Sequence, residues 1–304
     1  MVVVPVSVSV SVPLLPPPLV PGDLVAVVAP ASAFPREDLL RGMAWLRARY
    51  RLRVSPRIFE RQGYLAGPDA RRAAELAVAM RDDEVKAIVA ARGGYGAMRL
   101  LDALPWDALA RRPKWLVGFS DVTALHATAW AAGIASVHAP NVTGLGREIT
   151  PAARSAWIAC VERPAAARSW CGLSVLRSGE AAGPLVGGNL SLVHAMAAAG
   201  RLVVPPGAVL ALEDVTEAPY RIDRMLTSLR LGGHLARASA IVFGAFTRCA
   251  AGVDGLSALE VLAERTMDLG IPVLSGAPFG HEPHNEAFVL GCAARVVGDS
   301  VLLG

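Results

Sequence analysis

The residue of this chain best placed to do chemistry is Ser120, within the sequence KWLVGFSDVTALH at residues 114–126. The apolar run Trp115–Val117 predicts a buried strand, and Asp121–Trp130 predicts a helix. Ser120 therefore lies at a strand-to-helix corner, where open α/β sheets bind ligands and free N–H groups face them. The hydroxyl could be a nucleophile, or Ser120 or Asp121 could simply cap the helix. The final glycine of the G-x-S-x-G motif is missing, so that motif is not claimed.

Carboxylates follow a second apolar strand, Ala208–Leu212. Glu213 is closest to this strand, and Asp214 and Glu217 come after it. At least one is expected to stand at the strand end and point into the crevice. The alternative is a solvated acidic loop before the next helix. Residue type alone does not separate Glu213 from Asp214.

Two histidines, His281 and His284, lie in the loop GHEPHN at residues 280–285. A histidine there could act as a general base, since its pKa is ordinarily near ~6.5. A zinc site is disfavoured, because a proline interrupts helical spacing and H-E-x-x-H is absent. His126 and His138 are expected to be structural. Serine, carboxylate and histidine thus follow three strands, in the order that a Ser-Glu-His relay would require.

The turn Arg92–Gly96, with the sequence RGGYG, follows another predicted strand. Glycines let backbone N–H groups approach a ligand closely, so the turn could cradle a phosphate or supply an oxyanion-hole amide. Its spacing matches neither G-x-G-x-x-G nor the P-loop. A simple tight turn is the third alternative.

The elements that would position these residues alternate between strand and helix, which predicts a mostly parallel sheet covered on both faces. We expect a Rossmann- or flavodoxin-like N-terminal domain at 21–150, an irregular linker at 151–183 and a smaller C-terminal α/β domain at 184–304. Residues 287–303 alternate as antiparallel edge strands do. Strands are expected at 24–29, 53–58, 87–91, 115–117, 135–138, 208–212, 240–243 and 272–274, and helices at 36–50, 69–81, 97–104, 121–130, 190–198, 221–231 and 257–269.

Composition excludes several classes of protein. The net charge of +4 comes almost wholly from scattered arginines, so nucleic-acid binding is weakly supported. No apolar run approaches the roughly 20 residues of a membrane span. The four cysteines show no C-x-x-C spacing and are expected to be buried free thiols in a reducing compartment. Residues 1–20, rich in valine and proline, are expected to form a disordered leader.

Six colinear motifs resemble those of the LD-carboxypeptidases, a serine peptidase family that also includes the microcin-immunity hydrolases. The resemblance extends from about Pro21 to the end of the chain. Its motifs are VVAPAS at 27–32, ARGGYGAMRLLD at 91–102, GFSDVTALH at 118–126, GGNLSLV at 187–193, LEDVTEAPYRIDRML at 212–226 and PFGHEPHNEAFVLG at 278–291.

The resemblance implies roles for individual residues. Ser120 would be the nucleophile, Glu213 would orient the histidine, and His281 would be the general base. The oxyanion hole would be the backbone N–H of Asp121 with one amide of the glycine turn, preferably that of Gly94. The resemblance further implies two α/β domains with the triad across their interface, a cytoplasmic homodimer, and no metal or organic cofactor.

The implied reaction is hydrolysis of the bond between an L-configured centre, diaminopimelate or lysine, and a terminal D-alanine of a muropeptide, in cell-wall recycling. Arg92 and Arg221 are candidates to bind the substrate carboxylate, because a planar guanidinium pairs with it in two places. The chain departs from the family at residues 138–141, HAPN in place of HGPM, and at 200–202, where the family usually has Gly-Thr-Pro after the GGN helix. Substrate identity is therefore less determined than the triad.

Two alternatives remain. A microcin-immunity hydrolase would cleave peptidyl or aminoacyl nucleotide conjugates, and would need an aromatic platform for the base. Tyr95, Trp106 and Tyr220 are the available residues. The short segment between Ser120 and Glu213 resembles the muropeptide enzymes instead. The other alternative is a catalytically silent ligand-binding homologue.

Overall fold

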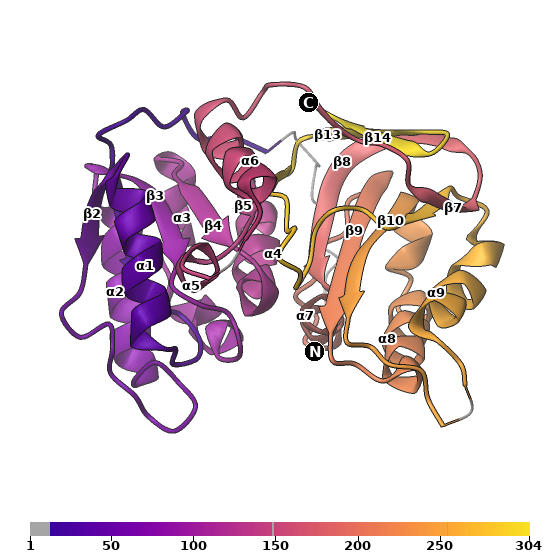
Figure 1. The fold of residues 1–304 in the computed structure, drawn as a ribbon, viewed down its shortest axis with the longest axis horizontal. Coiled ribbons are helices and arrows are strands. Elements are labelled where there is room, and N and C mark those ends of the chain that lie inside the picture. The colour runs from indigo at the N-terminus through magenta and orange to yellow at the C-terminus, as the bar shows by residue number, and fades with distance from the viewer. Residues whose placement is uncertain (1–12, 148, 254) are drawn as a thin grey trace, which may run out of the picture.

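The computed structural model of the chain describes residues 13–147, 149–253 and 255–304. These residues form two α/β units that lie side by side, each built on one sheet (Figure 1). The first sheet has six strands and the second has eight. The predicted fold class, two α/β units of which the first has a mostly parallel sheet, is confirmed.

The first sheet has the strand order β12-β5-β4-β3-β1-β2. All its pairings are parallel except that of β12, so the carboxyl ends of five strands meet at one edge. Its strands are β1 (Leu24–Val28), β2 (Arg51–Val54), β3 (Val85–Ala90), β4 (Trp115–Gly118), β5 (Ser136–His138) and β12 (Phe288–Leu290).

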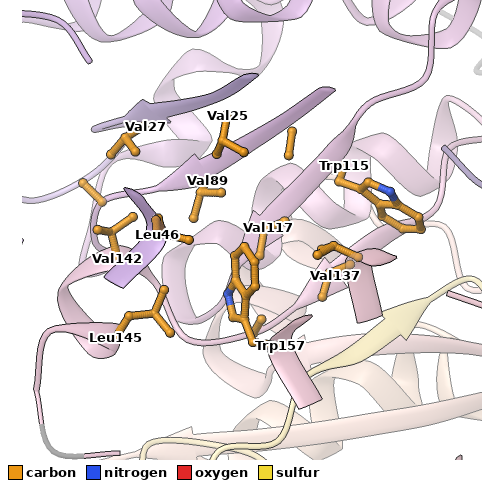
Figure 2. Close-up of a cluster of buried hydrophobic side chains, with 14 of the residues drawn as sticks. Val25, Val27, Leu46, Val89, Trp115, Val117, Val137, Val142, Leu145 and Trp157 are labelled. Atoms are coloured by element: carbon orange, nitrogen blue, oxygen red, sulfur yellow. The ribbon is translucent and has the colours of Figure 1, made fainter. Parts of the chain in front are cut away.

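Helices cover both faces of this sheet, which is why its strands are almost continuously apolar. Val25 and Val27 point to one face, and Ala26 and Val28 to the other. Figure 2 shows the first face, where Val117, Val137 and Trp157 share one buried cluster. That face packs on α1 (Arg36–Arg47), α5 (Val142–Leu145) and α6 (Pro151–Glu162), and the other packs on α2 (Asp69–Arg81), η1 (Ala97–Ala103), α3 (Trp106–Arg111) and α4 (Thr123–Ala131).

The second sheet has the order β6-β14-β13-β8-β9-β10-β11-β7, with a parallel centre and antiparallel strands at both sides. Its helices gather on one face. Its strands are β6 (Arg168–Trp170), β7 (Ser174–Arg177), β8 (Glu180–Asn189), β9 (Ala208–Val215), β10 (Ala238–Thr247), β11 (Val273–Ser275), β13 (Ala293–Val297) and β14 (Ser300–Leu303), and its helices are α7 (Leu190–Ala198), α8 (Pro219–Leu231), η3 (Leu235–Arg237), α9 (Ala258–Thr266) and η4 (Met267–Leu269).

The C-terminal strands divide between the two sheets. We predicted antiparallel edge strands at 287–303. In the second sheet β13 and β14 are antiparallel, but they lie inside the sheet, because β6 is the edge strand on that side. In contrast, β12 returns to the first sheet, where Phe288 pairs with His138 of β5. The loop between β11 and β12 therefore starts in one unit and ends in the other, and it carries His281.

The segment 151–183 differs from the irregular linker that we predicted. Thr150 caps α6 by accepting the Ala153 N–H at 3.1 Å, and Pro151 opens the helix. Strands β6 and β7 follow and join the two edges of the second sheet. The division of the chain into domains at these bounds stays a prediction.

Part of the predicted disordered leader is ordered. Residues 1–12 lie outside the described residues, but residues 13–20 pack on the first unit. Leu19 is 2% exposed, and its N–H donates to Val161 O at 2.8 Å. Leu14 pairs with the backbone beside Ile134. Burial of Leu19 and backbone hydrogen bonding outweigh the proline content here, although Leu14 and Leu15 are exposed. No helix among the described residues is long and apolar enough to cross a membrane.

Candidate active site

Ser120 stands at a strained corner. It begins the 3-10 helix η2 (Ser120–Val122), one residue after the end of β4, with a φ of +65°. For a residue with a side chain, such backbone costs about 1–3 kcal/mol and is typical of functional sites. Neither η2 nor α4 has a side-chain N-cap, and Ser120 Oγ makes no hydrogen bond within the described part of the chain. The alternative in which Ser120 or Asp121 merely caps the helix is therefore wrong.

The glycine turn packs directly against this serine. A Cβ added to Gly93 would lie 2.8 Å from Ser120 Cβ and 3.1 Å from its Oγ, so residue 93 has no room for a side chain. Gly94 has a φ of +101°, and a Cβ there would meet Ser32 Oγ at 2.5 Å. The turn is thus more than a connection: its glycines bring the backbone against the Ser120 hydroxyl.

Asp121 links the glycine turn at residues 92–96 to the corner that carries Ser120. Its carboxylate is 2% exposed, and Oδ2 accepts the Ala97 N–H at 2.7 Å. Burial raises the pKa of this carboxyl to about 6, although the Ala97 N–H and the Arg72 guanidinium oppose the shift. The backbone N–H of Asp121 belongs to the first turn of η2, where N–H groups have no acceptor within the helix. Together with the Gly94 N–H, it stays the predicted oxyanion hole.

Glu213 and His281 form a hydrogen-bonded pair. Nδ1 of His281 lies 2.7 Å from Glu213 Oε2, and the Glu213 side chain is completely buried. Strand β9 runs to Val215, so Glu213 and Asp214 lie inside the strand and not in a solvated loop, which corrects that alternative. Asp214 is engaged elsewhere: it accepts hydrogen bonds from Asn189 and Ser191. Glu217 lies beyond the strand and pairs with Arg221 at 3.6 Å.

The loop that carries His281 is fixed at its base. Gly280 has a φ of +131°, and its N–H donates to the buried Asn285 Oδ1 at 3.1 Å. His284 turns away to Thr150 Oγ1 at 3.0 Å and to Glu286 at 3.1 Å. The two histidines of this loop therefore have separate partners. Within the described residues, no group of three or more His, Cys, Asp or Glu side chains could hold a metal ion.

The two halves of the site meet around Phe119. Its ring centroid is 4.7 Å from that of His281, and Phe119 directly precedes Ser120. The units also meet where the Asn189 N–H donates to Thr123 Oγ1 at 3.0 Å, an approach that only a glycine at 188 permits. No hydrogen bond joins Ser120 Oγ to His281 among the described residues. Catalytic hydrogen bonds are often formed only when substrate is bound.

The two candidate arginines lie in different surroundings. Arg92 adjoins Gly93 and donates to Ala33 O at 2.5 Å, and it has no ion pair within the described chain. Burial, with Arg147 and Arg61 nearby, lowers the pKa of its guanidinium. Arg221 is on the exposed first turn of α8, with Glu217 as its partner. Of these two arginines, Arg92 is the one without an ion-pair partner among the described residues.

The N-terminal domain model of the LD-carboxypeptidases matches residues 25–139, and their C-terminal domain model matches residues 182–296. The chain belongs to the LD-carboxypeptidase family. It is therefore a carboxypeptidase of the serine type, and the resemblance read from the six motifs is confirmed.

Relatives cover almost the whole chain. A protein of Synechocystis sp. is 39% identical over 295 residues, which are 94% of this chain and 95% of that protein. The murein tetrapeptide carboxypeptidase of Pseudomonas aeruginosa is 32% identical over 288 residues, which cover 90% of this chain and 93% of that protein. The crystal structure of muramoyltetrapeptide carboxypeptidase from Oxalobacter formigenes superposes with a TM-score of 0.83 at 27% identity. The superposition covers 92% of this chain and 97% of that structure. The microcin C7 self-immunity protein MccF shares the fold, with a TM-score of 0.87 at 21% identity. The match covers 96% of this chain and 98% of that structure.

Sequence reasoning did not predict the role of one residue of this carboxypeptidase, Asn141, which supports the backbone before the serine. Asn141 Oδ1 accepts the Phe119 N–H at 3.2 Å, and a Cβ at Gly118 would come within 2.8 Å of that oxygen. Asn141 stands where the family motif HGPM has methionine, so that departure was the available signal. The Asn141 side chain thus positions the backbone at the corner that carries Ser120.

His138, which we expected to be structural, lies beneath the nucleophile corner as part of the core. It is fully buried, stacks on Phe288 at 4.7 Å and contacts Phe119 and Phe279 edge-on, each at 5.8 Å. Neither of its ring nitrogens has a partner among the described residues. Burial holds its pKa well below the ordinary value, so the ring is neutral. His126, as expected, is structural: it contacts Ser136 and Gly118 O, each at 2.9 Å.

The cysteines differ in part from expectation. All four are free, and Cys160 is buried, but Cys171 is exposed because it lies in the turn after the edge strand β6.

Proposed function

We propose that the protein is a serine LD-carboxypeptidase that releases the terminal D-alanine from a muropeptide whose preceding centre, diaminopimelate or lysine, is L-configured. The observation that carries this proposal is the buried Glu213–His281 pair, 2.7 Å apart, beside the corner that presents Ser120. The murein substrate of the Pseudomonas relative supports the choice of peptide.

In the proposed reaction, the hydrogen bond to Glu213 holds the proton of neutral His281 on Nδ1 and leaves Nε2 as the acceptor. Nε2 takes the proton of Ser120 Oγ as the oxygen attacks the carbonyl carbon of the L-centre. The tetrahedral intermediate collapses, the C–N bond breaks, and His281 returns the proton to the amine of D-alanine. Water then attacks the acyl-enzyme, again with His281 as the base, and regenerates Ser120.

Glu213 stabilises the imidazolium that forms in each step. It is well suited to this because its carboxylate is completely buried, where a charge interaction is stronger than in water. Its second oxygen, Oε1, has no partner within the described residues. The pair with His281 is therefore the main interaction that compensates for burying this carboxylate.

The backbone N–H groups of Asp121 and Gly94 would receive the developing oxyanion. Backbone donors are suited to this role because they do not have to reorganise during the reaction. The packing of Gly93 on Ser120 and the hydrogen bond from the Ala97 N–H to Asp121 hold together the segments that follow β3 and β4. Loss of one such donor typically costs about 10²–10³ in rate.

For the substrate carboxylate we propose Arg92 in preference to Arg221. Arg92 adjoins the turn that touches the serine and lacks an ion-pair partner in the described chain, whereas Arg221 is already paired and exposed. A carboxylate that docks there would neutralise a charge that is partly desolvated.

We further propose that the protein acts as a cytoplasmic homodimer in cell-wall recycling, without metal or organic cofactor. Four free cysteines support a reducing compartment. Sedimentation velocity of the purified chain tests the dimer, and a single monomeric species would contradict it.

Hydrolysis of nucleotide conjugates is the alternative reaction, since MccF has the same fold. Mass spectrometry of the protein incubated with L-Ala-γ-D-Glu-meso-diaminopimelate-D-Ala, with Ser120→Ala alongside, separates the two. Loss of one alanine with the native protein alone supports the proposal. No loss with either protein would contradict it and favour the conjugates. A silent ligand-binding homologue would cleave neither substrate, and its Ser120 would resist a fluorophosphonate probe.

A further inference from the structure

We propose that the carboxypeptidase has a saccharide-binding subsite, formed by Tyr64 and Tyr95 and the polar hollow beside Tyr64, which takes the sugar of a muramoyl peptide. This inference rests on the proposed function, because it concerns the non-reacting end of the same substrate. Four contacts lead from Ser120 to this place.

The first contacts join the serine to Tyr95. Gly93 packs on Ser120, and Gly94 follows with its Cα against Ser32. Tyr95 comes next in the chain, and its N–H donates to Ser32 Oγ at 3.0 Å. Tyr95 is thus only two residues from the glycine that touches the nucleophile, yet its side chain is 52% exposed.

The next contacts join Tyr95 to Tyr64. The two rings meet edge to face, with centroids 5.6 Å apart and an interplanar angle of 71°. The loop of Tyr64 is anchored, because Tyr64 O accepts the Ala33 N–H at 3.1 Å and Leu65 bridges to Ser32. Tyr64 is 64% exposed although its backbone is held in place. The two rings therefore form an aromatic surface that is open to solvent and carried by an anchored backbone.

A hollow of about 430 Å³ adjoins Tyr64, and its polar lining includes Gln62, Asp69 and Arg99. Arg99 Nε donates to Asp69 Oδ2 at 2.8 Å, so the carboxylate and guanidinium are oriented in advance. The volume lies within the roughly 300–1,000 Å³ of small-molecule sites. An amide, a carboxylate and a guanidinium together offer donors and acceptors for the hydroxyl and acetamido groups of a sugar.

This combination fits a sugar better than a nucleobase. The C–H face of a pyranose ring packs on an aromatic surface, while its hydroxyl groups need polar partners at the rim. A base would favour parallel aromatic faces on which it can stack, but these two rings are closer to perpendicular. In a muramoyl tetrapeptide, the sugar is at the opposite end from the D-alanine that the reaction releases. The surface leads away from Ser120 toward the loop after β2, which is the edge strand remote from the second unit.

The kinetic test compares kcat/KM for the muramoyl tetrapeptide with that for the free tetrapeptide. We expect the native protein to prefer the muramoyl form, and Tyr64→Ala to lower the ratio of the two values by about 3–10-fold, as loss of an aromatic contact would. Tyr64→Phe, which keeps the ring, should retain most of the preference. Leu231→Ala, on an 84% exposed residue at the end of α8, is the control for surface substitution. A ratio that Tyr64→Ala leaves unchanged would overturn the proposal.

A binding measurement separates this inference from the proposed reaction. Saturation-transfer NMR of the full chain with N-acetylmuramic acid needs no turnover, and adenosine serves as the comparison probe. We expect saturation of the sugar that Tyr64→Ala abolishes. If neither peptide is cleaved but the sugar signal depends on Tyr64, the reaction is wrong and the subsite stands. A Tyr64-dependent signal from adenosine alone, or no signal from either probe, would overturn the subsite.

Discussion

The two units contribute to the candidate site by different physical means. The first unit presents Ser120 through its backbone: a φ of +65°, a glycine turn packed on the serine, and an asparagine bonded to the neighbouring N–H. The second unit contributes side-chain chemistry, a buried carboxylate bonded to a histidine on a loop. Substitutions in the first unit should therefore act through geometry and strain, and those in the second through charge and proton location.

The loop of His281 is what joins the two kinds of element. Because β11 belongs to the second sheet and β12 to the first, the loop is tied to both units. The packing of Phe119 on His281 then fixes the histidine against the residue before the nucleophile. Substitutions in each unit can therefore test the contrast between a first unit that acts through backbone geometry and a second that acts through charge.

The largest effect is expected where both units must act together. Ser120→Ala and His281→Ala should each lower kcat on the tetrapeptide by about 10⁴–10⁶, as in other serine relays. The double variant should be no slower than either single variant, because the two residues act as one unit. Steady-state release of D-alanine measures this, and additive losses would show that they act separately.

Glu213→Gln tests the charge of the second unit alone. The amide would donate to His281 Nδ1 and place the imidazole proton on Nε2, where it blocks general-base catalysis. We expect a loss in kcat of about 10³–10⁴ with little change in KM. Kinetics at several substrate concentrations check this, and a rise in KM at constant kcat would refute the orienting role.

Gly93→Ala tests the geometry of the first unit. Its Cβ would lie 2.8 Å from Ser120 Cβ and displace the nucleophile, which we expect to lower kcat by about 10². Gly144→Ala is the matched control, since its Cβ would only contact Pro140 at an ordinary 3.4 Å. Equal activity of the two variants would show that the close packing at Gly93 does not matter for the reaction.

Asp121 should make stability depend on pH. Burial raises the pKa of its carboxyl from 3.8 to about 6, so the folded protein binds a proton that the unfolded chain releases. The protonated Asp121 therefore stabilises the folded protein fully below pH 3.8, the pKa of the unfolded chain. This stabilisation is lost as the pH rises through about 6, the pKa of the folded protein. Relative to Asp121→Asn, the native protein should therefore lose on the order of 2–3 kcal/mol in unfolding free energy between pH 4 and 6.5, by the ~1.4 kcal/mol per unit of linkage.

Denaturant unfolding at each pH measures that difference. Asp102→Asn, at an exposed carboxylate paired with Arg201, is the control and should change with pH much less. A difference between native protein and Asp121→Asn that stays constant over this range would contradict the linkage.

The smallest effect concerns backbone strain at the nucleophile. Ser120→Gly should be more stable than Ser120→Ala by about 1 kcal/mol, because glycine adopts a positive φ without steric cost. Both variants lack the hydroxyl, so catalysis does not enter the comparison. Thermal unfolding should give a Tm a few degrees higher for glycine. Equal Tm values would mean that the corner relaxes when the hydroxyl is removed.

The amino-acid sequence by itself determined the features that depend on neighbours in the chain. The buried run before Ser120 and the helix after it predicted the corner correctly, because a strand, a turn and a helix follow from local hydrophobic pattern. The alternation of elements predicted the two α/β units, and six motifs identified the family. Order in residues 13–20 was not predictable from their proline content, because it depends on the burial of Leu19 and on backbone hydrogen bonds with residues much later in the chain.

Only the tertiary structure decided which carboxylate meets the histidine. Glu213 and Asp214 are adjacent in β9, so their side chains point to opposite faces of the sheet. Glu213 reaches His281, whereas Asp214 binds Asn189 and Ser191. Which face is the site depends on where the loop of His281 returns, and that depends on β12 pairing with β5 of the other unit. Such a pairing joins residues about 150 apart, and no local pattern in the chain encodes it.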